Sequence, residues 1–278
     1  DEMRSRGFGC PFLLMTSGGG LTDLDTAVRF PIRLVESGPA GGAILATEIA
    51  KECGLANVVS YDMGGTTAKI CLIDNYAPQM TRTFEVARVY RNMKGSGLPV
   101  RIPAIEMVEI GAGGGSIAHV DTMGRLQVGP ESAGSEPGPA CYGRGGERPT
   151  VTDGDVVMGK VDPARFAGGS VALDIEASEH AVAGDVGKPM KLEGRLAAFA
   201  LAEIVDENMA NAARVHAIEW GKDISARAMI AFGGAAPLHA ARLAEKLSIH
   251  TIVVPTGAGV GSAIGFLRAP VSYEVVRS

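Results

Sequence analysis

The segment from Asp62 to Thr67 reads Asp-Met-Gly-Gly-Thr-Thr, and its residue types can bind a phosphate and a metal ion. Glycines expose backbone amides, threonine hydroxyls add donors, and a carboxylate can hold hydrated Mg²⁺. The flanking runs 58–62 and 68–74 are apolar and rich in β-branched residues, which predicts a β-hairpin with this motif at its tip. An ordinary glycine-threonine hairpin with Asp62 as a turn former is the alternative.

A second motif, Phe232 to Pro237, reads Phe-Gly-Gly-Ala-Ala-Pro and follows an apolar run. Small residues at the end of a strand leave room for a flat purine or ribose against the backbone. Close packing of the strand on the next helix is the alternative. The sequence lacks the G-x-x-x-x-G-K-[ST] pattern, so the pair of motifs does not indicate a Walker-type nucleotide site.

Two further glycine-rich segments could bind an anion. Glu36, Ser37 and Gly38 precede a predicted helix, where amide donors and the helix dipole favour negative charge. An ordinary helix cap by Ser37 is the alternative. Gly111 to Ser116 could form an anion-binding nest or a tight turn needed for packing.

Acidic residues in the middle of the chain are weaker candidates. Asp153 could supply a carboxylate for metal binding or general-base work, whereas turn capping is the simpler role for Asp155. His119 and Asp121 alternate on a predicted strand, but two ligands without a third make a weak metal site. The sequence therefore favours structural roles for most of these side chains.

The elements that must position these motifs alternate between strands and helices, which predicts an α/β fold. Strands are predicted at 31–36, 58–62, 68–74, 228–234 and 251–259, and helices at 43–54, 193–220 and 235–249. We expect 1–79 and 193–278 to form a nucleotide-binding α/β core, with 80–192 as a β-rich, glycine-rich and partly irregular insertion. Strand candidates within the insertion are 101–110, 116–120 and 126–128. His216 and His239 fall on predicted helices and read as packed or solvated side chains.

Composition excludes several classes of partner. Twenty-six lysines and arginines against 31 acidic residues give a net charge of −5, without the basic stripe that follows a phosphate backbone, so we expect no nucleic-acid partner. No apolar run reaches the length that spans a membrane. The four scattered cysteines form no C-x-x-C pair, which favours reduced thiols in a cytoplasmic protein.

Six segments in order resemble the signatures of the hydantoinase/5-oxoprolinase family, A subunit, in its central N-methylhydantoinase A-like domain. They are residues 35–42, 62–73, 109–121, 129–146, 149–155 and 231–240. The resemblance spans nearly the whole chain and implies an actin-like ATPase (ribonuclease H-like) fold. It also implies ATP and Mg²⁺ as cofactors, in enzymes that open cyclic amides or imides.

Carried over by residue, the resemblance implies phosphate or metal contacts for Asp62, Gly64, Gly65, Thr66 and Thr67. It implies adenosine contacts for Gly233, Gly234 and Ala235. Ser37 and Gly38 are further cofactor-binding candidates. The candidate metal ligand is Asp62, and the candidate catalytic residues are Asp62, Thr66 and Asp153.

The function that this resemblance implies is a component of an ATP-dependent hydrolase that phosphorylates the carbonyl oxygen of a hydantoin, N-methylhydantoin or 5-oxoproline type substrate. A hydantoinase B-type subunit is the expected partner. An acetone or acetophenone carboxylase-type subunit is one alternative, and a non-catalytic actin-like assembly module is another. The family's first phosphate loop, an earlier D-x-G-G-T copy, is absent from this sequence, so we expect an N-terminal lobe to be missing and the isolated chain to be inactive.

Overall fold

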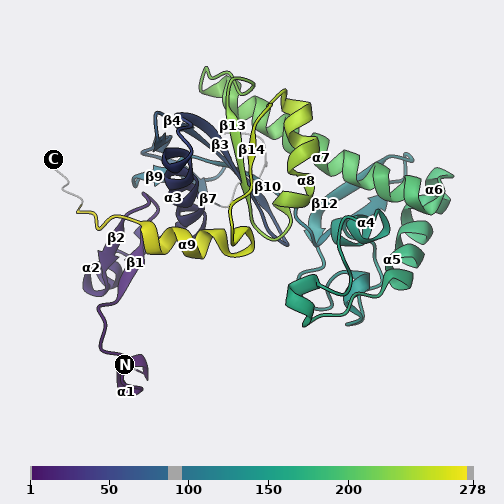
Figure 1. Cartoon of the computed structure of the whole chain (residues 1–278), viewed down its shortest axis with the longest axis horizontal. Helices are drawn as coiled ribbons and strands as arrows, with labels where there is room; N and C mark the ends of the chain where they lie inside the picture. Colours follow the sequence, from purple (N-terminus) through teal and green to yellow (C-terminus); the bar gives the residue numbers. More distant parts are fainter. Residues whose placement is uncertain (1, 87–95, 274–278) are drawn as a thin grey trace.

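The structure is a computed structural model that describes residues 2–86 and 96–273, built around one mixed sheet (Figure 1). Its strand order is β10-β4-β3-β13-β14, and β5 pairs with the last two residues of β4. β3, β13 and β14 run parallel, whereas β4 is antiparallel to both β3 and β10. The strand bounds are β3 Asn57–Met63, β4 Ala68–Asp74, β5 Ala77–Pro78, β10 Val108–Ile110, β13 Ala228–Phe232 and β14 Ile252–Val253.

Helices cover both faces of this sheet. Alternation along β3 sends Val58 to one face and Val59 to the other, because successive side chains of a strand point to opposite sides. Val58 packs in a cluster with α3 (Ser37–Glu52), and α9 (Gly261–Arg268) lies across α3. Val59 packs with α7 (Gly194–Glu219) and α8 (Ala236–Leu247). The result is the α/β layering that the sequence predicts.

The region before α3 differs from the prediction. Residues 31–36 were expected to be a strand, but Pro31–Leu34 form the 3₁₀ helix η1 and Glu36 adopts a left-handed backbone with φ 61°. Ser17 donates its hydroxyl to the carbonyls of Arg33 and Val35, so a buried side chain takes up the backbone acceptors that a neighbouring strand would use. Helix α3 then begins at Ser37 and has Pro39 in its first turn.

Glycines inside α3 allow α9 to approach closely. A Cβ on Gly265 of α9 would overlap the carbonyl of Gly41, and a Cβ on Gly41 would lie 2.7 Å from the carbonyl oxygen of Ser262. Gly42 likewise leaves room for the ring of Phe232, the last residue of β13. The glycine cluster in this part of the sequence thus serves helix packing and brings the start of α9 to the end of β13.

A small N-terminal unit lies beside α9. It contains α1 (Glu2–Ser5), β1 (Leu13–Met15), β2 (Leu21–Asp23) and α2 (Leu24–Arg29), with β1 and β2 paired antiparallel. Leu21 also forms a parallel bridge with Val271, so the unit is joined to the last described residues of the chain. Figure 1 shows the first and the last described residues, up to 273, on this side of the molecule.

Residues 80–192 contain more helix than predicted. The short pairs are β6 (Met80–Thr81) with β9 (Ala104–Ile105), β7 (Phe84–Val86) with β8 (Leu98–Val100), and β11 (Ser116–Val120) with β12 (Leu126–Ser132). The helical elements are η2 (Ala140–Tyr142), α4 (Val151–Val157), η3 (Phe166–Gly169), α5 (Ile175–Val182), η4 (Ala183–Gly187) and α6 (Lys188–Met190). Strands occur in all three predicted stretches. The division at 80 and 192 stays a prediction, since β10 lies within the predicted insertion but joins the central sheet.

The C-terminal third follows the sequence pattern closely. The predicted helices 193–220 and 235–249 correspond to α7 and α8, and the predicted strand 228–234 to β13. The stretch 251–259, predicted as a buried strand with a glycine turn, has the turn at 256–257, but the strand part is wrong in length and burial. β14 has two residues, Ile252 is 37% exposed, and η5 (Ala258–Val260) follows. β14 is an edge strand, so an apolar sequence there does not require burial on both faces. Within the described residues, no helix combines the length and apolarity needed to cross a membrane.

We predict that Gly265→Ala destabilises the protein by about 1–3 kcal/mol, because the added methyl forces α9 away from the backbone of α3. Urea unfolding followed by circular dichroism measures the change. Gly194→Ala is the matched control, since Gly194 begins α7 and a Cβ there meets nothing within 4 Å. Equal stability of the two variants would contradict this account of the packing.

Candidate functional site

The Asp-Met-Gly-Gly-Thr-Thr motif forms the tip of the β3–β4 hairpin, as predicted. Met63 pairs with Ala68, and the amide of Gly64 donates to the carbonyl of Thr67 at 3.0 Å, which closes the turn. Gly65 and Thr66 are exposed, and their amides make no hydrogen bond within the described part of the chain. The tip therefore offers backbone donors and a threonine hydroxyl to an outside ligand.

The second motif lies directly against the first. β13 is parallel to β3 with Phe232 beside Asp62, so the chain after Phe232 continues along the hairpin. Gly233 has φ 97°, and a Cβ there would meet the backbone of Met63 and lie 2.5 Å from Asp62 Oδ1. The amide of Ala235 donates to the carbonyl of Met63 at 2.9 Å. Only glycine at position 233 permits this approach.

The loop Gly111–Ser116 packs on the other side of the hairpin. The amides of Gly114 and Gly115 donate to the carbonyls of Gly64 and Gly65 at 2.9 and 2.6 Å. The whole loop is buried, and a Cβ on Gly113 would lie 2.7 Å from the backbone of Thr66. Of the two roles that the sequence left open, the structure supports packing, because the amides of this loop face the hairpin and not a solvent-accessible anion.

Three helices begin at the same edge of the sheet as the hairpin tip. α8 begins just after Ala235, and α9 contributes Ser262, whose hydroxyl donates to Asp62 Oδ2 at 3.1 Å. Lys69 links the site to the start of α3. It is the cross-strand neighbour of Asp62, and its ammonium lies 3.8 Å from the carboxylate of Glu36, the residue before α3. Helix N-termini at the carboxyl ends of parallel strands favour anion binding at this edge.

Ser37 and Gly38 form the first turn of α3. The helix has no side-chain cap hydrogen bond, so the alternative of a Ser37 cap is not supported. A Cβ on Gly38 would meet nothing within 4 Å, which leaves open space over this turn. Their role in nucleotide binding stays a prediction.

Asp62 is a half-buried carboxylate at the centre of the site. Burial raises its pKa, while the hydrogen bond from Ser262 and the charge of Lys69 act in the opposite direction. A bound cation would replace the lost hydration of the carboxylate. The donor set fits a hydrated Mg²⁺ held by one protein oxygen and phosphate oxygens, because Mg²⁺ keeps several waters and takes few protein ligands.

The site has few side chains where a nucleotide would need space. Gly234 is exposed and a Cβ there meets nothing within 4 Å. Thr66 is exposed and Thr67 is half-buried beside the tip. In residues 2–86 and 96–273 no three His, Cys, Asp or Glu side chains converge on a common metal position. A metal at Asp62 would therefore depend on the phosphates for most of its other ligands.

Asp153 does not belong to this site, which corrects the candidate catalytic role. It is fully buried and accepts hydrogen bonds from the amides of Ala140, Cys141 and Thr150 and from the hydroxyls of Thr150 and Ser178. Together with Thr150 it forms the capping box of α4. A carboxylate with this many internal donors and no exposure has a structural role.

Other sequence candidates also have structural roles. His119 is exposed, and Asp121 accepts from the backbone of Arg125 and Met123, which lowers the pKa of its carboxyl. All four cysteines are free thiols, as predicted: Cys10 and Cys53 are exposed, and Cys71 and Cys141 are buried.

Sequence reasoning missed three side chains that support the hairpin. Ser262 binds Asp62, Lys69 faces it across the strands, and Thr152 holds the carbonyl of Gly114 through its amide and its hydroxyl, both at 2.8 Å. The glycines at 257, 259 and 261, just before Ser262, were the only signal in the sequence that pointed to Ser262. Lys69 and Thr152 lie inside two of the six family segments, 62–73 and 149–155, but nothing in the sequence gave either side chain a role.

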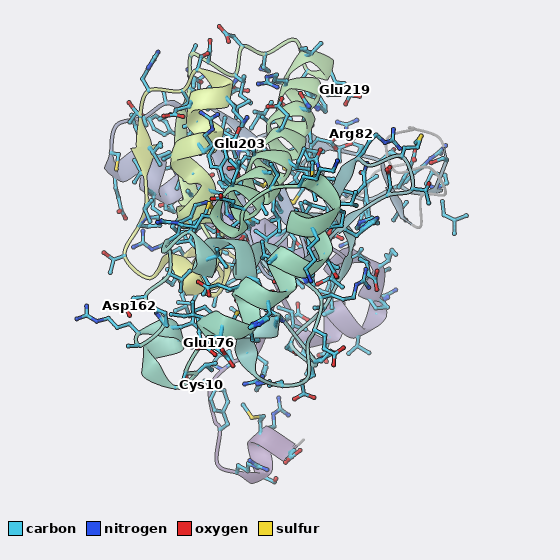
Figure 2. The ribbon with its side chains drawn as sticks, turned by 90° about the vertical axis from the view of Figure 1, so that its right-hand side faces the viewer. Cys10, Arg82, Asp162, Glu176, Glu203 and Glu219 are labelled. Atoms are coloured by element: carbon cyan, nitrogen blue, oxygen red, sulfur yellow. The ribbon has the colours of Figure 1, made fainter. Side chains whose placement is uncertain are left out.

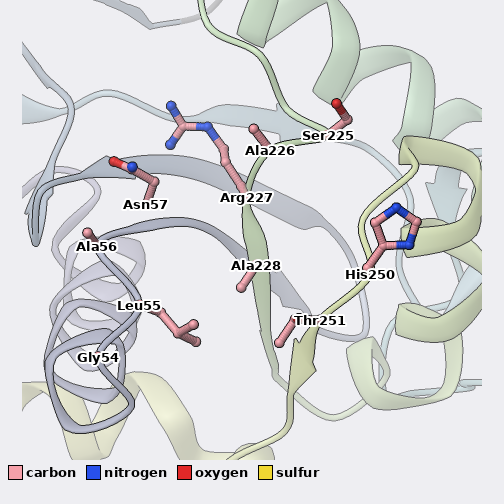
Figure 3. Close-up of a pocket in the computed structure, with 10 residues that line it drawn as sticks. All are labelled: Gly54, Leu55, Ala56, Asn57, Ser225, Ala226, Arg227, Ala228, His250 and Thr251. Atoms are coloured by element: carbon pink, nitrogen blue, oxygen red, sulfur yellow. The ribbon is translucent and has the colours of Figure 1, made fainter.

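Two cavities lie outside the hairpin tip. One of about 410 Å³ is at the opposite edge of the sheet, where Arg227 and Asn57 line it (Figure 3). Ligands of α/β sheets bind at the carboxyl ends of parallel strands, so this cavity is not part of the candidate site. The other, of about 300 Å³, is lined by Ser132 and Ala133, and Ala133 donates to Gly115 at 2.8 Å. It therefore adjoins the loop that packs on the hairpin.

The sheet order, the hairpin with its acid and the glycine loop beside it define an actin-like ATPase-type fold, as the sequence predicts. The family model described as hydantoinase/oxoprolinase matches residues 1–275. The chain belongs to the hydantoinase/oxoprolinase family.

Relatives of known name include hydrolases and carboxylases. Caprolactamase subunit alpha of Pseudomonas jessenii is 34% identical over 95% of this chain and 37% of its own length. Acetophenone carboxylase gamma subunit of Aromatoleum aromaticum is 36% identical over 95% of this chain and 35% of its own length. A nucleotide-free structure of acetone carboxylase, described as ATP-dependent, superposes with a TM-score of 0.83 at 28% identity, over 95% of this chain and 36% of that one. The chain thus spans little more than a third of these relatives.

We predict opposite outcomes for two adjacent glycines. Gly233→Ala should cost more than about 2 kcal/mol of stability, because it combines a positive φ with overlap against Met63 and Asp62. Gly234→Ala should change stability by less than about 0.5 kcal/mol, since its Cβ meets nothing. Thermal unfolding of the two variants measures both. A destabilised Gly234→Ala with an intact Gly233→Ala would contradict the docking described above.

Proposed function

We propose that this chain is the nucleotide-binding part of an ATP-dependent enzyme that opens a cyclic amide or imide of the hydantoin, N-methylhydantoin or 5-oxoproline type. The observation that carries the proposal is the exposed hairpin tip beside Asp62, with Gly233 against the same carboxylate. Family membership and the caprolactamase relative support the substrate class. The expected partners are a hydantoinase B-type subunit and an N-terminal lobe that completes the phosphate site.

The residues have separate tasks in this proposal. Asp62 holds hydrated Mg²⁺, with Ser262 orienting the carboxylate. The amides of Gly65 and Thr66 and the hydroxyls of Thr66 and Thr67 stabilise negative charge on the terminal phosphates. Gly64 supplies the turn.

ATP would supply the phosphoryl group that the carbonyl oxygen receives, with ADP as the leaving group, and this activates the carbonyl carbon. One water would then add to that carbon and the ring C–N bond would break to leave an amine and an acyl phosphate, from which a second water would release phosphate. Gly233, Gly234 and Ala235 leave room for the adenosine, and Ser37 and Gly38 add the N-terminal dipole of α3. The 300 Å³ cavity beside Ser132 is large enough for a small cyclic amide.

We predict that Asp62→Asn abolishes ATP turnover in the complete enzyme, by at least about a hundredfold, because an amide oxygen holds Mg²⁺ far less well than a carboxylate. Phosphate release and Mg-ATP calorimetry measure the loss. Asp162→Asn, at an exposed position labelled in Figure 2, is the control and should leave turnover unchanged. Full activity of Asp62→Asn would end the assignment of this site.

A ketone carboxylase is the second candidate, because two of the relatives described above are acetone and acetophenone carboxylases. Both functions would use the same hairpin and would differ in the acceptor that receives the phosphoryl group.

We predict that substrate-dependent phosphate release from the complete enzyme occurs with a cyclic amide and not with ketone plus bicarbonate. The panel is hydantoin, N-methylhydantoin, 5-oxoproline, acetone and acetophenone. Phosphate release that occurs only with acetone or acetophenone plus bicarbonate, and with none of the cyclic amides, would favour the carboxylase. Calorimetry with Mg-ATP that shows no heat, even with the partner lobe supplied, would favour the non-catalytic assembly module.

A further inference from the structure

His239 is fully buried near the start of α8, between two carboxylates from other helices. Its Nδ1 lies 2.8 Å from Asp206 Oδ1 of α7, and its Nε2 lies 3.1 Å from Asp155 Oδ2 of α4. A carboxylate only accepts hydrogen bonds, so two such neighbours require N–H groups on both ring nitrogens. The ring is therefore an imidazolium. This corrects the expectations that Asp155 caps a turn and that His239 is an ordinary packed side chain.

The charges around His239 are balanced. The ammonium of Lys160 lies 3.0 Å from Asp155 Oδ1, so two cations face two carboxylates. Tyr61 of β3 is a further titratable group close to the two carboxylates, and its hydroxyl lies within hydrogen-bond distance of the sulfurs of Met63 and Met209. Burial and the two carboxylate charges raise the pKa of Tyr61 well above its ordinary value, so it stays neutral.

A buried ion network of this kind stabilises a protein little compared with apolar packing, because desolvation offsets the attraction. Its better-attested role is to fix the register of the elements that carry it. On the outer surface α7 and α8 are already joined by Glu203, labelled in Figure 2, which pairs with Arg242 at 2.6 Å and Lys246 at 3.0 Å. The contact that His239 adds is the one to α4.

Both helices that His239 joins lead into loops that pack on the phosphate hairpin. α8 follows Ala235, whose amide donates to Met63 at 2.9 Å. α4 carries Thr152, which holds Gly114, and Gly114 in turn donates to Gly64 at 2.9 Å. A shift of α4 relative to α8 would therefore separate the two loops at the hairpin.

The structure assigns His239 the role of a positioning residue: its bonds to Asp155 and Asp206 keep the loops 111–116 and 233–235 docked on both sides of the hairpin tip. His239 does not itself contact the nucleotide. Its effect on ATP binding rests on the function proposed above, whereas its effect on the docking of the loops does not.

This role has a defined pH dependence. Burial acts to lower the pKa of His239, but the hydrogen bonds and charges of Asp155 and Asp206 outweigh it and raise the pKa to about 9. The unfolded value is near 6.5. The stabilisation is therefore complete below about pH 6.5 and is lost as the pH rises through about 9.

The test uses hydrogen exchange followed by mass spectrometry on His239→Gln and a control, Arg227→Gln. Arg227 is also buried and charge-paired, to Asp74, but lies at the opposite edge of the sheet (Figure 3). We expect amide exchange in 111–116 and 233–235 to rise at least tenfold in His239→Gln and to stay protected in Arg227→Gln. Equal protection of these loops in the two variants would overturn the proposal.

A second readout uses the complete enzyme. Because the residue acts on the nucleotide loops and not on the reacting atoms, His239→Gln should raise the KM for Mg-ATP about tenfold with kcat changed less than twofold. An unchanged KM together with faster loop exchange would overturn the effect on binding. If no variant or wild-type protein binds Mg-ATP, the proposed function fails, while the exchange result still decides the role of His239.

If His239→Gln does not fold, two other measurements test the proposal. Asp206→Asn keeps the shape of the side chain but removes one of the two carboxylates, and it should raise loop exchange by a smaller factor. The wild-type protein should lose protection in the same two loops between pH 8 and pH 10, after correction for the intrinsic exchange rate. Constant protection across that range would overturn the proposal without any variant.

Discussion

Backbone contacts on both sides of the hairpin tip hold the candidate site together. The tip receives hydrogen bonds from Gly114 and Gly115 on one side and lies against Gly233 on the other. These are contacts between main chains, so they need residues without a Cβ. The carbonyls of Gly64 and Gly65 take up these contacts, whereas Gly65 and Thr66 are exposed residues whose amides make no hydrogen bond within the described residues. Packing and ligand binding thus use opposite sides of the same turn.

The same constraint explains much of the glycine content. Of the clusters that stand out in the sequence, Gly41 and Gly42 serve helix packing, Gly113 to Gly115 serve the hairpin, and Gly233 serves Asp62. A sequence can show that backbone must approach something closely at these places. It does not show whether the approaching group is a ligand or another part of the same chain, and at these six glycines it is the main chain or a side chain of this protein.

Sequence reasoning reached the hairpin and the helices α7 and α8, because their periodicity and turn residues are local signals. It failed at 31–36, where the tertiary contact from Ser17 decides the conformation. It misjudged Asp153 because a capping box and a catalytic acid look alike until the donors around the carboxylate are known. The roles of Ser262 and Thr152 depend on contacts across 200 and 38 residues, which no local pattern encodes.

The ion network at His239 also could not be predicted from local sequence patterns. Asp155, Asp206 and His239 are 33 to 84 residues apart and lie on three helices, so none of them is informative alone. In the fold they meet behind the loops that the hairpin needs. Main-chain contacts define where each loop sits, and the ion network joins the helices α4 and α8 that lie behind them. A fully bonded imidazolium resists sliding of these helices, because any shift leaves a buried charge without its partner, and this is costly in a low-dielectric interior.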